Sequence, residues 1–119
     1  MPHIILEHSD NIPDQINYQN LFAQLHQILN QDLDVPINAI KSRRYISKDH
    51  YIANGNSKNF FIHLQISLLA GRMEEKLQKC AKNAKLALHN FFKQSNQLSE
   101  TSFSVEMRQI DPNLYQKRY

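Results

Sequence analysis

The 119-residue sequence lacks the features of a membrane-spanning or disulfide-bonded protein. Its single cysteine, Cys80, cannot form an internal disulfide, which fits a reducing cytoplasm. No apolar run approaches the ~20 residues that span a bilayer. The start of the chain also lacks the long apolar core of a signal peptide, because Glu7, His8 and Asp10 interrupt it early. We therefore expect a cytoplasmic protein with no membrane partner.

The sequence also has no metal or cofactor motif. Its six histidines show no ligand spacing of the kind found in a His-Glu-x-x-His helix. We therefore predict structural or surface roles for them, with neither metal nor cofactor. For His3 and His63, which fall in predicted strands, packing and substrate contact are both open. Cys80 lies in a helical pattern without a partner base and is interpreted as a packing residue.

Charge and composition describe a globular protein with a mild positive excess. The chain is 41% hydrophobic and 21% charged, with a net charge of +3. These proportions are typical of a folded protein and not of a disordered one. The length suits a single domain, 1–119, with one core. The charge is too small to require nucleic acid, but it suits an anionic partner.

Hydrophobic periodicity predicts two strand–helix–strand units joined by a turn. The expected strands cover about 3–8, 38–47, 60–68 and 101–110. The expected helices cover about 17–30, with Asn17 as N-cap, and 73–94. A polar linker is expected at 95–99, and the basic, polar tail 111–119 need not be ordered on its own. The two units, about 2–47 and 59–110, resemble each other at a period of about 60 residues.

This order predicts an α+β fold, in which a four-stranded mixed sheet carries two helices on one face. No further helix is available for the opposite face, which indicates oligomerisation or a ligand there. The second strand presents Lys41, Arg43 and Tyr45 on one side. Burying two cations there would be costly unless an anion or an acidic partner meets them. An ordinary solvated strand face is the alternative interpretation.

The first residues carry a chemical signal of their own. A proline directly after Met1 becomes a free secondary amine once methionine aminopeptidase removes the methionine. The apolar strand that follows would hold this amine at the edge of a cavity. Burial and nearby cations lower the pKa of an amine, toward the value that suits a general base at neutral pH. Pro2 is therefore a candidate base, although a proline at this position can also be an ordinary residue.

Five segments of the chain, in order and at the right spacing, carry a family resemblance. They are Met-Pro-His-Ile-Ile-Leu-Glu-His-Ser-Asp-Asn-Ile at 1–12, Ile-Lys-Ser-Arg at 40–43, Phe-Ile-His-Leu at 61–64, Ala-Gly-Arg at 70–72 and Phe-Ser-Val-Glu at 103–106. They resemble the 5-carboxymethyl-2-hydroxymuconate delta-isomerases of the tautomerase superfamily, to which 4-oxalocrotonate tautomerase and macrophage migration inhibitory factor also belong. The opening segment and the Ala-Gly-Arg turn together are specific.

The resemblance implies a homotrimer of pseudo-repeated β-α-β units with active sites at the subunit interfaces. It assigns Pro2 as the proton-shuttling base, and Lys41, Arg43 and Arg72 as residues that bind the substrate's carboxylates. Lys41 departs from the family, which has arginine there, and lysine lacks the planar fork that grips a carboxylate at two points. Met73 stands where relatives usually place a capping serine or threonine, which weakens the helix start by about 1 kcal/mol.

The chemistry of these residues agrees with an isomerase that needs no cofactor. Moving a double bond along a 2-hydroxy or 2-oxo di- or tricarboxylate needs one base, and positive charge for the carboxylates and the dienolate. The resemblance points to 5-carboxymethyl-2-hydroxymuconate, from homoprotocatechuate catabolism, as the substrate. Arg72 is otherwise interpreted as a solvated surface residue. Glu7 and Glu106 are either ion-pair partners of the site's cations or exposed strand carboxylates.

Two alternative interpretations stay open. A superfamily member with a different substrate, or a cytokine-like relative, fits the same fold, and Lys41 favours the former. The β-α-β-β-α-β order is also that of RNA-recognition domains, and residues 58–64 faintly echo their aromatic third strand. The glycine of that motif is absent, and Ile4, Ile5 and Leu6 occupy the strand that needs a stacking aromatic. We therefore expect no nucleic-acid partner.

Overall fold

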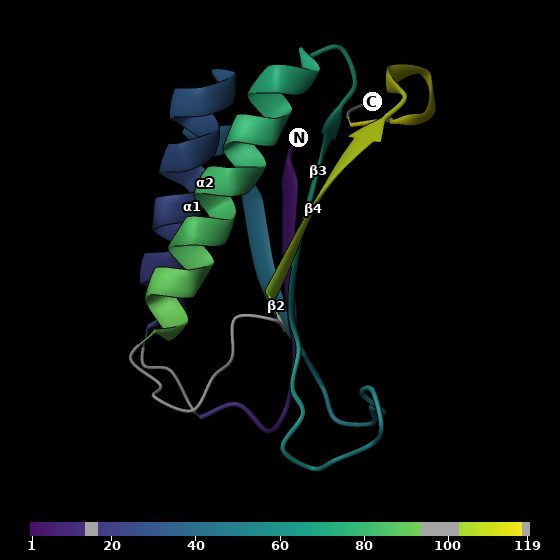
Figure 1. Ribbon diagram of the computed structural model, residues 1–119. Helices are drawn as coiled ribbons and strands as arrows, with labels where there is room; N and C mark the ends of the chain where they lie inside the picture. Colours follow the sequence, from purple (N-terminus) through teal and green to yellow (C-terminus); the bar gives the residue numbers. More distant parts are fainter. Residues whose placement is uncertain (14–16, 94–102, 118–119) are drawn as a thin grey trace.

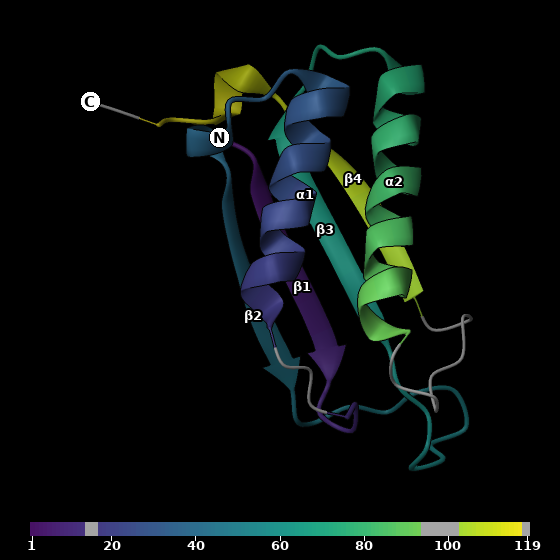
Figure 2. The ribbon, with the colours of Figure 1, turned by 90° about the vertical axis from the view of Figure 1, so that its left-hand side faces the viewer.

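The computed structural model describes residues 1–13, 17–93 and 103–117, which form two layers (Figure 1). One layer is a sheet of the strands β1 (His3–Ser9), β2 (Lys41–Ser47), β3 (Ile62–Leu69) and β4 (Phe103–Ile110). The other layer contains the helices α1 (Tyr18–Leu33) and α2 (Glu74–Phe92). Both helices cover the same face of the sheet (Figure 2). The predicted α+β fold is therefore confirmed.

The strands lie in the order β2-β1-β3-β4. β1 pairs in parallel with β2, β3 pairs in parallel with β4, and the two central strands β1 and β3 are antiparallel. Each helix therefore connects two adjacent parallel strands, as a strand–helix–strand unit requires. The sheet is mixed because two such units meet along β1 and β3.

The core lies between the sheet and the helices and follows the periodicities of the sequence. On the central strands every second side chain points toward the helices, and those of Leu6, Leu64 and Ile66 have no exposed surface. On α1 the buried residues are four positions apart: Leu21, Leu25, Leu29 and Leu33. Each such side chain contributes about 1.5–3 kcal/mol relative to leaving it exposed. The stability of the fold therefore rests on the helix-covered face of the sheet.

Cys80 belongs to this core and has no exposed surface. Burial, and after it the charge of Asp32, raises the pKa of the Cys80 thiol to about 12. The thiol is therefore protonated at neutral pH and is not a nucleophile. The interpretation of Cys80 as a packing residue is confirmed.

The two ends of α1 have local causes. The side chain of Asn17 accepts a hydrogen bond from the backbone N–H of Asn20 at 3.2 Å, which confirms the predicted N-cap. The helix continues past the predicted end at residue 30 and stops at Leu33. It stops there because Asp34 adopts a left-handed conformation with φ of 55°, from which its N–H bonds back to the carbonyl of Asn30.

Three other boundaries differ from the prediction. β2 begins at Lys41 and not near residue 38, because Ile37–Ala39 form a 3-10 turn, η1. β3 begins at Ile62 and not at residue 60, because the N–H of Phe61 bonds to the side-chain oxygen of Ser9 at 3.1 Å. α2 begins at Glu74. The predicted linker 95–99, and the expected element ends at 94 and 101–102, lie outside the described residues.

The start of α2 lacks the capping side chain that helices usually have. Met73 occupies the N-cap position in an extended conformation, makes no side-chain capping bond and is 60% exposed. We expect Met73→Ser to raise the free energy of unfolding by about 1 kcal/mol, because a serine hydroxyl would accept from one of the first helical N–H groups. Urea denaturation measures the change, with Met73→Ala as the control that shortens the side chain without capping. Equal stability of the two variants would contradict the prediction.

The described part of the tail, residues 111–117, has more order than the sequence predicts. Pro112–Leu114 form a second 3-10 turn, η3, in which the Asp111 side chain accepts from the backbone N–H of Asn113 at 2.9 Å. Both ribbon views draw this turn at the end of the sheet that holds the chain N-terminus (Figures 1 and 2). The tail therefore contributes side chains to that end.

Candidate active site

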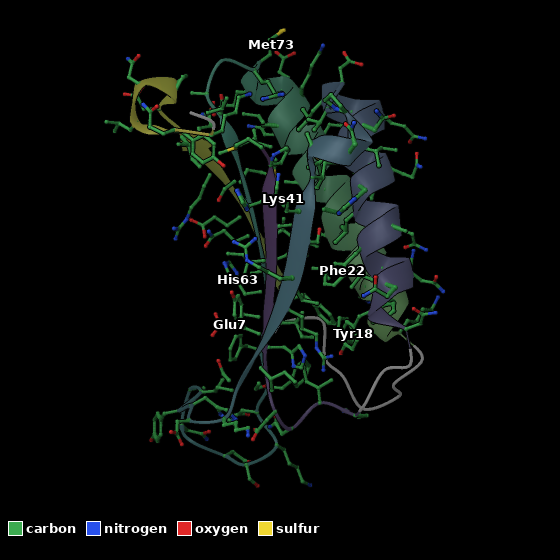
Figure 3. All side chains as sticks on the ribbon, turned by 180° about the vertical axis from the view of Figure 1, so that it is seen from behind. Glu7, Tyr18, Phe22, Lys41, His63 and Met73 are labelled. Atoms are coloured by element: carbon green, nitrogen blue, oxygen red, sulfur yellow. The ribbon has the colours of Figure 1, made fainter. Side chains whose placement is uncertain are left out.

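The face of the sheet turned away from the helices, here called the open face, carries mainly polar side chains. Figure 3 shows Glu7 and His63 on this side, whereas Tyr18 and Phe22 lie on the side of the helices. None of the described helices covers the open face. This is the face on which the sequence predicts an oligomeric partner or a ligand.

One end of the open face holds the start of the chain. Pro2 is buried, and its carbonyl accepts a hydrogen bond from the backbone N–H of Lys41 at 3.1 Å. The parallel register continues this contact by pairing His3 with Lys41 and Ile5 with Arg43. Lys41 and Arg43 therefore lie on the same face as His3, as their alternation along the strand predicts. The backbone ladder, and not a side-chain contact, fixes Lys41 next to Pro2.

Three cations surround the α-amino group at this end. Burial lowers the pKa of the Met1 amine below its ordinary value of 8.0, and the charges of Lys41, Lys117 and Arg72 lower it further. The three come from different parts of the chain: the start of β2, the tail and the turn after β3. An amine in these surroundings gives up its proton more readily than an exposed one.

Arg72 reaches the site from the turn between β3 and α2. Its Nη1 donates a hydrogen bond to the carbonyl of Leu69 at 3.2 Å. Gly71 precedes it with φ of +126°, a conformation that would strain any residue with a side chain. The N–H of Ala70 donates to the carbonyl of Ile110 at 2.9 Å, which ties the turn to the end of β4. The Ala-Gly-Arg segment thus holds a half-buried guanidinium near the chain N-terminus.

Arg43 contacts a histidine. Its Nη1 donates to Nδ1 of His3 at 3.1 Å, and Nε2 of His3 lies 3.0 Å from the hydroxyl of Tyr115. Burial lowers the pKa of His3, and the charges of Arg43 and Lys41 lower it further. The ring is therefore neutral at physiological pH. The structure brings Pro2, Lys41 and Arg72 together, and it joins Arg43 to them through His3.

Two residues at this end, Tyr115 and Lys117, have no signal in the sequence. The tail shows no hydrophobic period, so its return to the start of β1 is a tertiary effect that pattern reasoning cannot reach. His3 falls in a predicted strand, and the parallel register places it on the same side as Lys41 and Arg43. Nδ1 of His3 contacts Arg43, and a contact of His3 with substrate stays a prediction.

The acidic residues of the open face lie away from the predicted site cations. Glu7 accepts a hydrogen bond from the Ser47 hydroxyl at 2.6 Å. Glu106 pairs with Arg108 at 3.0 Å and with His63 at 3.3 Å, and the hydrogen bond from Arg108 is the main reason that the pKa of Glu106 is lowered. Within the described residues, neither carboxylate is paired with Lys41, Arg43 or Arg72, so a pairing with the site's cations stays a prediction. The cations near Pro2 therefore keep their charge for another partner.

The described part of the chain contains no group of three histidine, cysteine, aspartate or glutamate side chains that could hold a metal ion. Among its helices, none is both long and apolar enough to cross a membrane. What the arrangement offers chemically is an amine of lowered pKa beside several cations. Such a site can remove a proton from an acidic carbon and stabilise the anion that results.

The fold is that of tautomerase-like proteins. A solved structure titled a fused 4-OT wild-type symmetric trimer has the same fold with a TM-score of 0.71 at 15% identity, covering 92% of this chain and 85% of that one. The crystal structure of a 5-carboxymethyl-2-hydroxymuconate isomerase from Deinococcus radiodurans R1 gives a TM-score of 0.86 at 24% identity, covering 98% of this chain and 88% of that one.

The family model for 5-carboxymethyl-2-hydroxymuconate isomerase matches residues 2–119, and the chain belongs to this family of isomerases. The 5-carboxymethyl-2-hydroxymuconate Delta-isomerase of Escherichia coli is 26% identical over 114 residues, which are 96% of this chain and 90% of that protein. The resemblance that the opening segment and the Ala-Gly-Arg turn indicate is therefore confirmed, and the protein is an isomerase.

Proposed function

We propose that this protein moves a double bond in an unsaturated 2-hydroxy or 2-oxo carboxylate, and that its substrate is 5-carboxymethyl-2-hydroxymuconate. The observation that carries the proposal is the first amine of the chain, which lies among Lys41, Arg72 and Lys117 and has a lowered pKa. The family and the E. coli relative support the choice of substrate. A base beside cations suits a reaction that passes through an anion.

The base in this proposal is the secondary amine of Pro2 after removal of Met1. Pro2 is buried, and the cations that lower the pKa of the Met1 amine would act on the proline nitrogen as well. A neutral amine takes the proton from one carbon of the conjugated system and returns it to another. The reaction needs neither metal nor organic cofactor.

The cations divide the remaining work. Lys41 and Arg72 bind carboxylates of the substrate, and their charge also stabilises the dienolate. Arg43 binds substrate as well, because a guanidinium has five N–H groups and His3 occupies only part of them. Lys41 binds as a point charge, whereas the family has the planar guanidinium of an arginine at this position. A preference for a different di- or tricarboxylate would therefore arise at Lys41.

The proposal includes a homotrimer in the cytoplasm that acts in homoprotocatechuate catabolism. The uncovered open face supports an assembly, and the neighbour of known structure that is titled a trimer supports this number of subunits. The single buried cysteine suits a reducing compartment. The site at the sheet end then lies where a second subunit would meet the open face.

A nucleic-acid-binding function is not favoured. The strands of each β-α-β unit are neighbours in this sheet, whereas in the split β-α-β arrangement another strand lies between them. The central strands present Ile5, Glu7, His63 and Gln65 to the open face, and none of these is the aromatic side chain that stacks on a base.

Intact mass combined with an isomerase assay on 5-carboxymethyl-2-hydroxymuconate tests the proposed function. We expect the native protein to have lost Met1 and to be active without added metal or cofactor. Loss of Met1 with no turnover of this substrate would refute the substrate and leave the fold assignment in place. A panel of related unsaturated dicarboxylates then distinguishes another substrate from an inactive protein.

The pH dependence of kcat/KM is expected to show the amine directly. The neutral amine is the active form, so activity falls as the pH drops through the pKa of the Pro2 amine, which burial and the cations that lower the pKa of the Met1 amine are proposed to lower as well. Lys41→Gln removes a nearby positive charge and therefore raises this pKa, which moves the acidic limb of the profile to higher pH. Lys41→Arg keeps the charge and is the control, for which we expect the acidic limb at the same pH as in the wild type. A limb that stays in place in Lys41→Gln would contradict the electrostatic argument.

A further inference from the structure

We propose that the hydroxyl of Tyr115 donates a hydrogen bond to the substrate oxygen that becomes negative as the double bond moves, and that His3 orients this hydroxyl. The inference rests on the proposed isomerase function and adds a donor from the tail, which the sequence leaves without a role. It follows from the direction of the two hydrogen bonds that link Arg43 to His3 and His3 to Tyr115. It also follows from the position of the tail beside the N-terminus.

The direction of the hydrogen bonds is fixed at Arg43. A guanidinium only donates, so Nδ1 of His3, 3.1 Å from Nη1 of Arg43, must be the acceptor. A neutral imidazole then carries its proton on Nε2, which donates to the Tyr115 oxygen at 3.0 Å. The Tyr115 oxygen receives a hydrogen bond, and its own proton is left to donate outward. Hydrogen bonds that are linked in a series polarise one another, which strengthens the last donor.

The surroundings keep His3 in the form that this direction requires. Burial, Arg43 and Lys41 all lower the pKa of His3, which keeps the ring neutral. A protonated ring would carry a hydrogen on each nitrogen and would repel Arg43. The pairing of His3 with Lys41 in the parallel register, and with Ser67 in the antiparallel one, fixes the backbone beneath the ring.

The tail holds Tyr115 at this place. η3 ends directly before it, and the backbone N–H of Tyr115 donates to the carbonyl of Pro112 at 3.4 Å. The rings of His3 and Tyr115 meet edge to face, with their centres 6.3 Å apart. Two residues further on, Lys117 lies close enough to the first amine to lower its pKa. The phenol therefore lies beside the end of the chain at which Pro2 is proposed to act.

A neutral donor has a different use from the cations around it. The carboxylates of the substrate carry full charge throughout the reaction, and Lys41 and Arg72 match that charge. The oxygen of the dienolate gains charge only as the proton leaves carbon, and a polarised phenol interacts more strongly with it in the transition state than in the bound substrate. An interaction that strengthens in this way raises kcat and leaves KM largely unchanged.

Tyr115→Phe tests the donor, because it removes the hydroxyl and keeps the ring. We expect kcat to fall about tenfold, with KM changed less than about twofold, because the lost hydrogen bond is stronger in the transition state than in the bound substrate. The inhibition constant of adipate, a saturated six-carbon dicarboxylate, should stay unchanged, because adipate forms no dienolate. Tyr51→Phe is the matched control, since Tyr51 is 80% exposed in a distant loop. A kcat equal to that of wild type, or a weakened binding of adipate at unchanged kcat, would overturn the proposal.

A double-mutant cycle tests the role of His3 as a positioning residue. His3→Leu should lower kcat by about the same factor as Tyr115→Phe, and the double variant should be no slower than the slower single variant, because both remove one interaction. His3→Gln retains a side-chain N–H donor and should recover part of the activity. This variant also tests the role of His3 if His3→Leu folds poorly. Factors that multiply in the double variant would refute the link. Wild-type protein without isomerase activity would refute the proposed function instead, so the two failures are distinguishable.

Discussion

Replacing Pro2 with alanine is expected to lower kcat by about 100-fold or more, within the range of about 10²–10⁴ that a positioned general base contributes. Alanine is also small enough for removal of Met1, so the variant would still begin with an amine. That amine is primary, rotates freely and lacks the ring that fixes the direction of the nitrogen lone pair. The carbonyl of residue 2 would still accept from the N–H of Lys41, so we expect the fold to be retained. Steady-state kinetics on protein of verified mass measure the effect.

A form that keeps one extra residue before Pro2 completes this experiment. Its proline nitrogen is an amide and has no useful basicity, so we expect turnover to disappear, whereas Pro2→Ala retains a remnant. Unchanged thermal unfolding of both forms would exclude a loss of structure as the cause. If the extended form worked at the wild-type rate, the base would have to be another group, and the mechanism proposed for Pro2 would be wrong.

Replacing Arg72 with alanine is expected to lower kcat/KM by about 10- to 150-fold, mostly through KM. The estimate corresponds to the roughly 1.5–3 kcal/mol of a hydrogen bond that involves a charged group. The Gly71 turn and the contact with the Leu69 carbonyl hold the guanidinium in place before substrate arrives, so little of this energy is spent on ordering the side chain. Substrate-dependence curves separate KM from kcat.

Two further variants make the Arg72 result specific. Arg72→Lys keeps the charge and loses the planar fork, so it should fall between wild type and alanine. Lys79→Ala removes one exposed positive charge from the surface of α2 and should leave the kinetics unchanged. A KM for Arg72→Ala within twofold of wild type would mean that Arg72 is a solvated residue with no part in binding.

Sequence patterns predict the architecture well where the chain alternates or repeats. The second strand alternates, so that the shared face of Lys41 and Arg43 follows from the sequence, and the register of β2 with β1 confirms it. The N-cap of α1 is also predicted correctly, because the Asn17 side chain bonds to a backbone N–H only three residues away. The start of β3 is predicted less accurately. The N–H of Phe61 bonds to the side-chain oxygen of Ser9, and hydrophobic periodicity does not indicate such a bond.

The sequence predicts only part of the candidate site, because long-range contacts leave no local pattern. Pro2, Lys41, Arg43 and Arg72 stand in motifs, and the structure brings three of them to one end of the open face. The contact of His3 with Tyr115 joins residues 112 positions apart, through a tail with no pattern of its own. Glu106 lies on the open face and pairs with Arg108 two residues away, a partner that the sequence pattern does not indicate.

The arrangement of the sheet has a consequence for the number of sites. The antiparallel pairing of β1 with β3 relates the two β-α-β units by an approximate two-fold rotation, in which Ile62 is the counterpart of Pro2 and Ser104 that of Lys41. The nitrogen of Ile62 is an ordinary peptide amide, however, because a chain has only one start. A trimer would therefore hold three bases and not six. The start of β3 therefore needs no catalytic residue and can diverge in sequence as long as the shared core is preserved, whereas the turn after β3 has to keep Arg72.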